Sequence, residues 1–263
     1  MAEVQNYRFS VNRNWVGGVY ADRQYYLTHV LACSKAFTTL ITSPLVLSIC
    51  DELLGFPYRL KALRYYETYG RHIMQWHTDN KTDRGFAHIP GIIFLVYLAQ
   101  VDDGEFQYVR GSQQWSGQTA YSDYTDAYIN SCHRADVVSF KGPRGALLIY
   151  DTYGIHRAKP VMTKNFLRRS LFFQVDSKID SAEPILLNPA FVDSLDEKRK
   201  TYLGFGLPAD YQIYPQTSMN SLPIRRMNMG AVINWVGYRT LRCVYDWMPY
   251  GVRTFLRETH WLR

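Results

Sequence analysis

The feature that most restricts the fold of this chain is a series of short apolar segments separated by turn sequences. The segment GIIFLVYLAQV, from Gly91 to Val101, is rich in the β-branched and aromatic residues that favour strands over helices. Turn sequences recur along the same part of the chain, up to Ser177: TDRGF, VDDGE, VRGSQ, FKGPRGA and YDTYG. Such spacing is typical of a sandwich or jelly roll of antiparallel strands. The sequence therefore predicts a mainly β core.

Helical patterns flank this core on both sides. Residues 20–54 carry apolar side chains at spacings of three and four, which predicts two helices broken near Ser43-Pro44. Beyond the strands, SLDEKRKTYLGFGL predicts a polar helix, and Met227–Met248 predicts an apolar helix. A helical wheel of the second segment gathers its polar residues in one narrow stripe: Asn228, Arg239, Arg242 and Asp246.

A chain of 263 residues, 47% hydrophobic and 20% charged, is long enough for one core with extensions. We expect N-terminal helices and the β core in residues 1–177, and a helical, basic and aromatic extension of the same domain in residues 178–263. Four widely spaced cysteines indicate neither a zinc site nor a disulfide framework. The N-terminus lacks a leader pattern, and no stretch of ~18 uninterrupted apolar residues occurs. The expectation is a cytoplasmic protein.

The hexapeptide QWHTDN places His77 and Asp79 two residues apart. On a strand, side chains two residues apart point to the same side, so both could converge on one metal ion. By themselves they could equally be a hydrogen-bonded polar pair at a strand end. A 2-His-1-carboxylate set, which leaves open positions on Fe(II), needs a second histidine downstream.

Two histidines could complete the set. His156 follows the apolar segment GALLIYD, and Arg168 comes twelve residues later in the strand-like segment FLRRSLFFQV. His133 is followed eleven residues later by Arg144, but that arginine lies in the turn sequence KGPRGA. An arginine on a strand can be aimed and desolvated to bind a carboxylate, whereas one at a turn tip is badly placed for this. His156 is therefore preferred, and His133 is expected at the surface.

Taken in order, four segments between Leu63 and Val175 resemble the phytanoyl-CoA dioxygenase family of Fe(II)/2-oxoglutarate oxygenases. They are WHTD, DDGEFQYVRGSQ, GPRGALLIYDTYGIHRA and RRSLFFQ. The family's Pro-Gly-Ser-His element is replaced here by Arg110-Gly111-Ser112-Gln113. Because that element shapes a turn and does not bind iron, the replacement leaves the expected chemistry intact.

The resemblance implies a double-stranded β-helix (jelly roll, cupin-like) with N-terminal helices buttressing one sheet. It implies Fe(II) bound by His77, Asp79 and His156, with 2-oxoglutarate and O2 as co-substrates. Arg168 would bind the distal carboxylate of 2-oxoglutarate, and Arg169 is the alternative. The implied reaction is hydroxylation of an unactivated C–H bond.

The choice between the two arginines rests on their spacing from other residues. The interval from His156 to the arginine is usually one residue shorter in the family, which leaves Arg169 and Arg168 as candidates. A small residue two places later and a polar residue six places later recur in the family. Ser170 and Gln174 match these positions if Arg168 is the anchor.

The positive charge of the chain is concentrated at its C-terminal end. Residues 224–263 contain seven Arg, no Lys and two acids, so +5 of the net +7 lies there, interleaved with aromatic residues. Such a segment suits contact with an anionic membrane surface, although packing on the core or on a partner subunit is the commoner fate. No nucleic-acid-reading motif accompanies the charge, so no nucleic acid partner is expected.

The substrate stays open at this stage. Members of the family hydroxylate fatty acyl-CoA, amino acids, alkaloids and sugars. The basic, aromatic C-terminal segment favours an anionic, lipid-linked substrate at the inner membrane, such as the Kdo sugar of lipopolysaccharide, with the protein bound peripherally there. The alternatives are a hydroxylase of a soluble metabolite (amino acid, acyl-CoA or natural product) and a non-catalytic jelly-roll binding protein.

Overall fold

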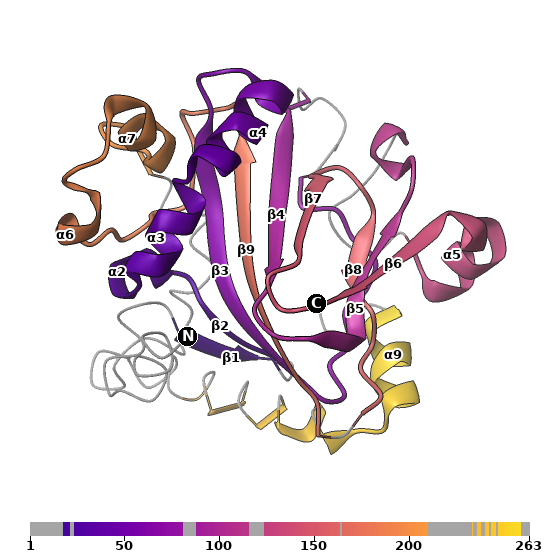
Figure 1. The fold of residues 1–263 in the computed structure, drawn as a ribbon. Helices are drawn as coiled ribbons and strands as arrows, with labels where there is room; N and C mark the ends of the chain where they lie inside the picture. The colour runs from indigo at the N-terminus through magenta and orange to yellow at the C-terminus, as the bar shows by residue number, and fades with distance from the viewer. Residues whose placement is uncertain are drawn as a thin grey trace.

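The computed structural model describes most of the chain between residues 18 and 209 and part of the C-terminal region: residues 18–21, 24–80, 88–115, 124–163, 165–209, 233, 236–237, 240–241, 243–245 and 247–258. These residues form two antiparallel sheets, with helices on the outer face of the larger sheet (Figure 1). The predicted mainly β, jelly-roll-like fold is confirmed. The two sheets do not close into a barrel among the described strands.

The larger sheet has six strands, in the order β1 (Gly18–Ala21), β2 (Gln24–Leu27), β3 (Arg59–Tyr69), β9 (Leu167–Asp176), β4 (Gly91–Tyr97) and β7 (Leu147–Asp151). The smaller sheet has the order β6 (Val137–Gly142), β5 (Val101–Val109) and β8 (His156–Ala158). The helices are α2 (Val30–Cys33), α3 (Lys35–Ile41), α4 (Pro44–Leu54), α5 (Asp126–Cys132), α6 (Pro189–Val192), α7 (Glu197–Leu203) and α9 (Tyr250–Glu258), with short 3-10 helices η2 (Ser112–Gln114) and η3 (Arg134–Asp136).

The helical prediction is wrong for the start of the segment 20–54. This part of the chain forms β1 and β2, and β2 pairs antiparallel with β3, with Tyr25 opposite Glu67 and Leu27 opposite Tyr65. Pairing with an already formed strand edge overrides the local helical pattern, because it satisfies backbone groups and buries Tyr25 and Leu27. The predicted break at Ser43 is confirmed, since its side chain caps α4 by accepting a hydrogen bond from the Val46 N–H.

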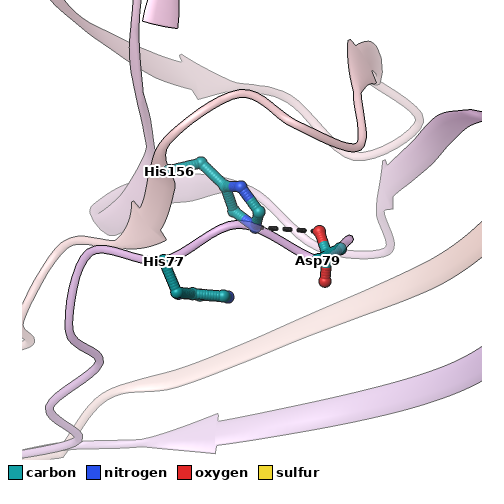
Figure 2. A group of neighbouring side chains, drawn as sticks. All are labelled: His77, Asp79 and His156. Atoms are coloured by element: carbon teal, nitrogen blue, oxygen red, sulfur yellow. Dashed lines mark ion pairs between the residues drawn. The ribbon is translucent and has the colours of Figure 1, made fainter. Parts of the chain in front are cut away.

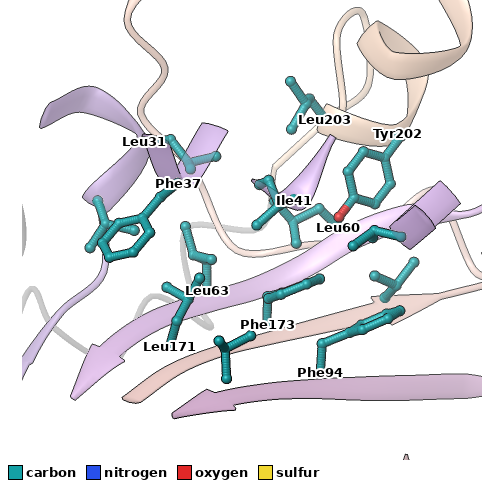
Figure 3. Close-up of a cluster of buried hydrophobic side chains, with 14 of the residues drawn as sticks. Leu31, Phe37, Ile41, Leu60, Leu63, Phe94, Leu171, Phe173, Tyr202 and Leu203 are labelled. Carbon is teal, nitrogen blue, oxygen red and sulfur yellow. The ribbon is translucent and has the colours of Figure 1, made fainter. Parts of the chain in front are cut away.

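The strand β4 shows why its sequence is apolar at every position. All of its residues are buried, because both faces of the larger sheet are covered. Phe94 packs among the helices on the outer face and stacks on Phe173 of β9, with ring centroids 4.6 Å apart (Figure 3). Leu95 and Tyr97 face the smaller sheet, where they pack with Phe106 of β5. A continuous apolar run is what a strand buried on both sides requires.

The outer core lies between the larger sheet and the helices α2, α3, α4 and α7. Leu31, Phe37, Ile41, Tyr202 and Leu203 contribute helix side chains to it (Figure 3). The stretch Lys35–Leu54 has the length and apolar composition of a membrane span, but α3 and α4 within it are separate helices. Both bury one face in this core, as core helices of water-soluble domains also do.

Alternation along β9 sorts its side chains between the two faces of the larger sheet. Leu171, Phe173 and Val175 belong to the outer core. Phe172, one position out of step, packs instead against the cluster between the two sheets. Side chains at even-numbered positions of β9 therefore point between the sheets, and those at odd-numbered positions point towards the helices.

The C-terminal part is helical where the structure describes it. The polar helix prediction is confirmed by α7. Every residue that the structure describes between 233 and 247 is helical, and these residues precede α9. The residues of the expected polar stripe lie outside the described residues: Asn228, Arg239, Arg242 and Asp246.

A buried histidine in the outer core makes stability depend on pH. His29 is 4% exposed, and its Nδ1 accepts a hydrogen bond from the Leu186 N–H at 3.2 Å. Burial, and then the nearby Arg64 guanidinium, lowers the pKa of His29 to about 4 from 6.5. The unfolded chain therefore binds a proton that the folded chain rejects, so stability is lost as pH falls from about 6.5 towards 4.

We expect His29→Gln, which keeps an acceptor, to reduce this loss by up to about 3 kcal/mol, the equivalent of the pKa difference. Denaturant unfolding at pH 7 and pH 4.5 gives the fall in the free energy of unfolding for the wild type and for the variant. The other titrating groups contribute equally to the two proteins, so their effect cancels in the difference. An identical fall in stability for the two proteins would contradict the assignment.

Candidate metal centre

A single backbone pairing brings the two distant histidines together. His77 does not lie in a regular strand but forms an isolated antiparallel bridge with His156, the first residue of β8. The His77 N–H donates to the His156 carbonyl at 3.0 Å, and the His156 N–H donates to the His77 carbonyl at 2.9 Å. The motif QWHTDN thus forms no regular strand, and only His77 pairs with the edge of the smaller sheet.

The residues beside this bridge clamp it from the other side. Trp76 and Arg157 precede and follow the paired histidines, and the Arg157 guanidinium lies 4.2 Å from the centroid of the Trp76 ring. Both side chains donate hydrogen bonds to the carboxylate of Asp126 in α5. Because neighbouring residues point to opposite sides, this clamp directs the two imidazoles towards the inside of the fold.

Backbone contacts also fix Asp79. The N–H groups of Asp79 and Asn80 both donate to the Thr152 carbonyl at 3.1 Å, and the Asn80 side-chain amide donates to the Thr152 hydroxyl. These contacts tie the motif to the end of β7 and turn the Asp79 carboxylate towards His156, with its Oδ2 3.2 Å from Nε2 (Figure 2).

The two imidazoles are held in the same orientation. Nδ1 of His77 lies 2.8 Å from the Gln75 carbonyl, and Nδ1 of His156 lies 2.9 Å from the Gly154 carbonyl. A carbonyl only accepts, so each Nδ1 carries a proton, and in the neutral ring Nε2 is then the nitrogen that has the lone pair for a metal ion. One ligand atom from each of His77, Asp79 and His156 lies within 4.8 Å of the others (Figure 2).

The electrostatics favour the protonation states that a metal ion requires. Burial, and then the neighbouring His156, lowers the pKa of His77 to about 4. Burial opposes ionisation of Asp79, but the attraction of His156 and His77 outweighs it and holds the pKa of that carboxyl below its ordinary value. Neutral imidazoles and an ionised carboxylate are the forms that bind metals.

The donor set also leaves a buried atom that a cation would satisfy. Although the Asp79 side chain is 20% exposed, its Oδ2 is buried and accepts no hydrogen bond from the described residues. Nε2 of His156 lies 3.2 Å from this oxygen, and in the neutral ring with Nδ1 protonated it carries a lone pair. Two electron-rich atoms 3.2 Å apart repel each other unless a cation or proton lies between them. The residues therefore fit a 2-His-1-carboxylate site.

The two candidate arginines lie on opposite faces of the larger sheet. Arg168, at an even-numbered position of β9, points between the sheets and donates hydrogen bonds to the Gly104 carbonyl of β5 and the Thr68 hydroxyl of β3. Arg169 points to the helix-covered side, where its Nε lies 3.4 Å from Oε1 of Glu67. Of the two, only Arg168 shares the inner face on which the histidines lie.

Arg168 keeps unused hydrogen-bonding capacity. It is 6% exposed, and its Nε has no hydrogen-bond acceptor among the described residues. Burial lowers the pKa of its guanidinium, which Tyr97 and Glu105 partly counteract. A buried cation with an unsatisfied donor is arranged to bind an anionic group.

The rejected candidates lie elsewhere, as expected. His133 caps the end of α5, where its ring lies 4.2 Å from the ring centroid of Trp115 and its Nδ1 lies 3.6 Å from Asp136. Arg144 is exposed in the turn between β6 and β7. The structure does not bring either residue to the cluster of His77 and Asp79.

Sequence reasoning missed the aromatic residues around the cluster. The Tyr150 hydroxyl lies 3.5 Å from Nε2 of His156, and Phe106 packs on both rings, with centroids 4.6 Å from Tyr150 and 5.4 Å from His156. The available signal was alternation in LLIYD, which places Tyr150 on the same face as Leu148, facing the smaller sheet.

The unusual turn Arg110-Gly111-Ser112-Gln113 supports the cluster indirectly. Gly111 adopts a left-handed conformation, with φ of 78°. The Ser112 hydroxyl donates to the Val109 carbonyl and accepts from the Ile155 N–H at 2.7 Å, next to His156. Gln113 accepts a hydrogen bond from the Tyr108 hydroxyl at 3.2 Å. The segment therefore forms a turn, as the family resemblance implies for this element, and its contact with Ile155 positions the approach to β8.

Comparison with known proteins supports the fold. No family model matches the sequence, and no curated protein matches it. Crystal structures of HygX from Streptomyces hygroscopicus do match: one with nickel, 2-oxoglutarate and hygromycin B bound and one with nickel and 2-oxoglutarate bound, each with a TM-score of 0.52. Identity is 18%, over 70% of this chain and 82% of HygX. The chain thus shares the cupin-like fold of HygX.

Gly154 packs so closely against Tyr108 that a larger residue at this position should destabilise the protein. A Cβ at Gly154 would lie 2.0 Å from the Tyr108 hydroxyl and 2.2 Å from its ring. We expect Gly154→Ala to lower stability by about 1–3 kcal/mol, because Tyr108 or the backbone must shift. Gly251→Ala in α9, whose Cβ would meet nothing within 4 Å, is the matched control and should be neutral or slightly stabilising. Equal melting temperatures for the two variants would contradict the packing argument.

Proposed function

We propose that this protein is an Fe(II)- and 2-oxoglutarate-dependent dioxygenase that hydroxylates an unactivated C–H bond. The observation that carries the proposal is the convergence of His77 Nε2, His156 Nε2 and the Asp79 carboxylate on one point inside the fold. The fold shared with HygX, and the ordered resemblance to the phytanoyl-CoA dioxygenase family, support the same reaction class.

The residues of the chain prepare the site in distinct ways. The Gln75 and Gly154 carbonyls hold the imidazoles of His77 and His156 in the metal-binding tautomer, and such partners of ligands strengthen metal binding. Bound Fe(II) would supply open positions for 2-oxoglutarate and O2, which together with the substrate are converted into hydroxylated product, succinate and CO2. Asp79 contributes the negative charge that offsets the cation.

Arg168 is proposed to bind the distal carboxylate of 2-oxoglutarate. It lies on the inner face of the larger sheet, it is buried, and its Nε is available for a further hydrogen bond. Arg169, the alternative, is engaged by Glu67, which is almost fully buried. Phe106 and Tyr150, packed on the His156 ring, restrict water at the reacting centre.

Two substrate classes remain as proposals. An anionic, lipid-linked molecule, such as the Kdo sugar of lipopolysaccharide at the cytoplasmic side of the inner membrane, is suited by the basic, aromatic C-terminal segment 224–263. A soluble metabolite (an amino acid, acyl-CoA or natural product) is the second, and the binding of hygromycin B by HygX favours it. A non-catalytic jelly-roll protein is disfavoured, because binding alone does not require three converging ligands of this type.

Iron binding is the direct test. The wild-type protein should retain one Fe(II) per chain after anaerobic loading and desalting, whereas His77→Ala and His156→Ala should lose it because each removes a ligand. His133→Ala, which changes a histidine outside the cluster, is the matched control and should retain iron. Full iron content in both cluster variants, measured by metal analysis, would overturn the proposal.

The co-substrate site is tested by anaerobic titration of the Fe(II) protein with 2-oxoglutarate, following the metal-to-ligand charge-transfer absorbance. Arg168→Ala should weaken binding by more than tenfold, since losing a buried charge-assisted pair costs about 2–5 kcal/mol. Arg169→Ala should leave the affinity nearly unchanged while lowering stability, because it strips Glu67 of its cation. Equal losses of affinity, or a greater loss in Arg169→Ala, would move the anchor to Arg169.

A further inference from the structure

The C-terminal helical region exposes large apolar side chains to an unusual degree. Five of them have about half or more of their surface exposed: Ile233 63%, Val236 49%, Leu241 64%, Val244 51% and Trp247 88%. We call these five residues the C-terminal apolar face. Single exposed apolar residues are ordinary on protein surfaces, but a grouped set marks a site of interaction.

Helical spacing places these residues on one side. At 100° per residue, Ile233, Val236, Val244 and Trp247 fall within about 80° of one another, and Leu241 lies at the margin of the same side. Tyr245, which the same spacing directs elsewhere, is 3% exposed. The region therefore has an inner side that packs on the protein at Tyr245 and an exposed side on which the five apolar side chains lie, with the exposed Thr240 among them.

An arginine attaches the inner side to the protein body. Arg253 of α9 is 1% exposed, donates a hydrogen bond to the Arg71 carbonyl and lies 5.7 Å from the centroid of the Tyr245 ring. Arg253 therefore packs on the protein, as the alternative of packing on the core implies for this segment, and is not part of a charged surface. With Tyr245 and Arg253 fixed, the C-terminal apolar face is held outwards.

The charge of the segment identifies the partner. Residues 224–263 carry seven Arg against two acids, so the net charge stays strongly positive, at +4, even without Arg253. A second copy of the chain would bring two such positive segments together, which is unfavourable, whereas anionic lipid headgroups would neutralise them. A nearly fully exposed Trp also suits the membrane interface, where indole rings are enriched.

We propose that the C-terminal apolar face docks this protein on an anionic lipid bilayer, with the apolar side chains entering the headgroup region and the net positive charge of residues 224–263 attracted to the lipid phosphates. This docking does not depend on the metal centre. It would bring the protein to the surface at which a lipid-linked substrate is found.

The test is sedimentation with lipid vesicles. The full-length protein should sediment at low salt with vesicles containing phosphatidylglycerol and phosphatidylcholine, and not with phosphatidylcholine alone. Trp247→Ser/Val244→Ser should weaken binding at least tenfold, and rising salt should weaken binding of the wild type. Leu45→Ser/Leu53→Ser on α4, where the two side chains are 61% and 55% exposed, is the matched control and should bind like the wild type.

Two outcomes would overturn the proposal. One is equal sedimentation of the wild type and of Trp247→Ser/Val244→Ser, which would mean that the face makes no contact with lipid. The other is a wild-type dimer that does not bind vesicles and that becomes monomeric in the same variant, measured by analytical ultracentrifugation. The second result would assign the face to another copy of the chain. His77→Ala should bind vesicles normally, so failure of the iron site and failure of docking are distinguishable.

Discussion

The candidate site depends on one short piece of backbone pairing, the bridge between His77 and His156. Two residues far apart in the sequence exchange both backbone hydrogen bonds. Without this bridge the imidazoles would not share a position, because His77 belongs to no regular strand. The stacked pair of Trp76 and Arg157, held by Asp126 of α5, reinforces the bridge on the opposite side. A single backbone bridge thus determines where the candidate metal ligands lie.

A second constraint is that both faces of the larger sheet are covered, one by helices and the other by the smaller sheet. Successive side chains along a strand therefore enter two different environments. Adjacent arginines on β9 illustrate this, since Arg168 reaches across to the Gly104 carbonyl of the smaller sheet while Arg169 meets Glu67 under the helices. A shift of one residue in the pairing of β9 with β3 would exchange their environments. The register, with Arg168 opposite Thr68 and Arg169 opposite Glu67, therefore decides which of the two arginines faces the smaller sheet.

Much of the fold could be predicted from local patterns, because strands and turns reflect near neighbours in the sequence. The composition of the run Gly91–Val101 predicted a strand, found as β4 (Gly91–Tyr97), and Ser43-Pro44 predicted the break at which α4 begins. Residues 20–27 were mispredicted because their strands form only by pairing with β3, a partner that local periodicity does not reveal. Arg253 as an internal anchor was missed for the same reason, because its contact with the Arg71 carbonyl exists only after distant segments meet. Tyr150 beside His156 was also missed, although alternation along LLIYD could have indicated which way it faces.

The inner face of the fold leaves two complementary deficits. At one position the buried Oδ2 of Asp79 lies 3.2 Å from Nε2 of His156, a separation that calls for a cation or a proton between the two atoms, and at another the buried Nε of Arg168 lacks an acceptor among the described residues. Each unsatisfied group costs free energy, so folded proteins keep few of them unless a ligand supplies the missing partner. A cation would satisfy the first, and an anionic group the second. A dicarboxylic keto acid bound to that cation has a chelating end and a free carboxylate, so it could meet both demands with one molecule.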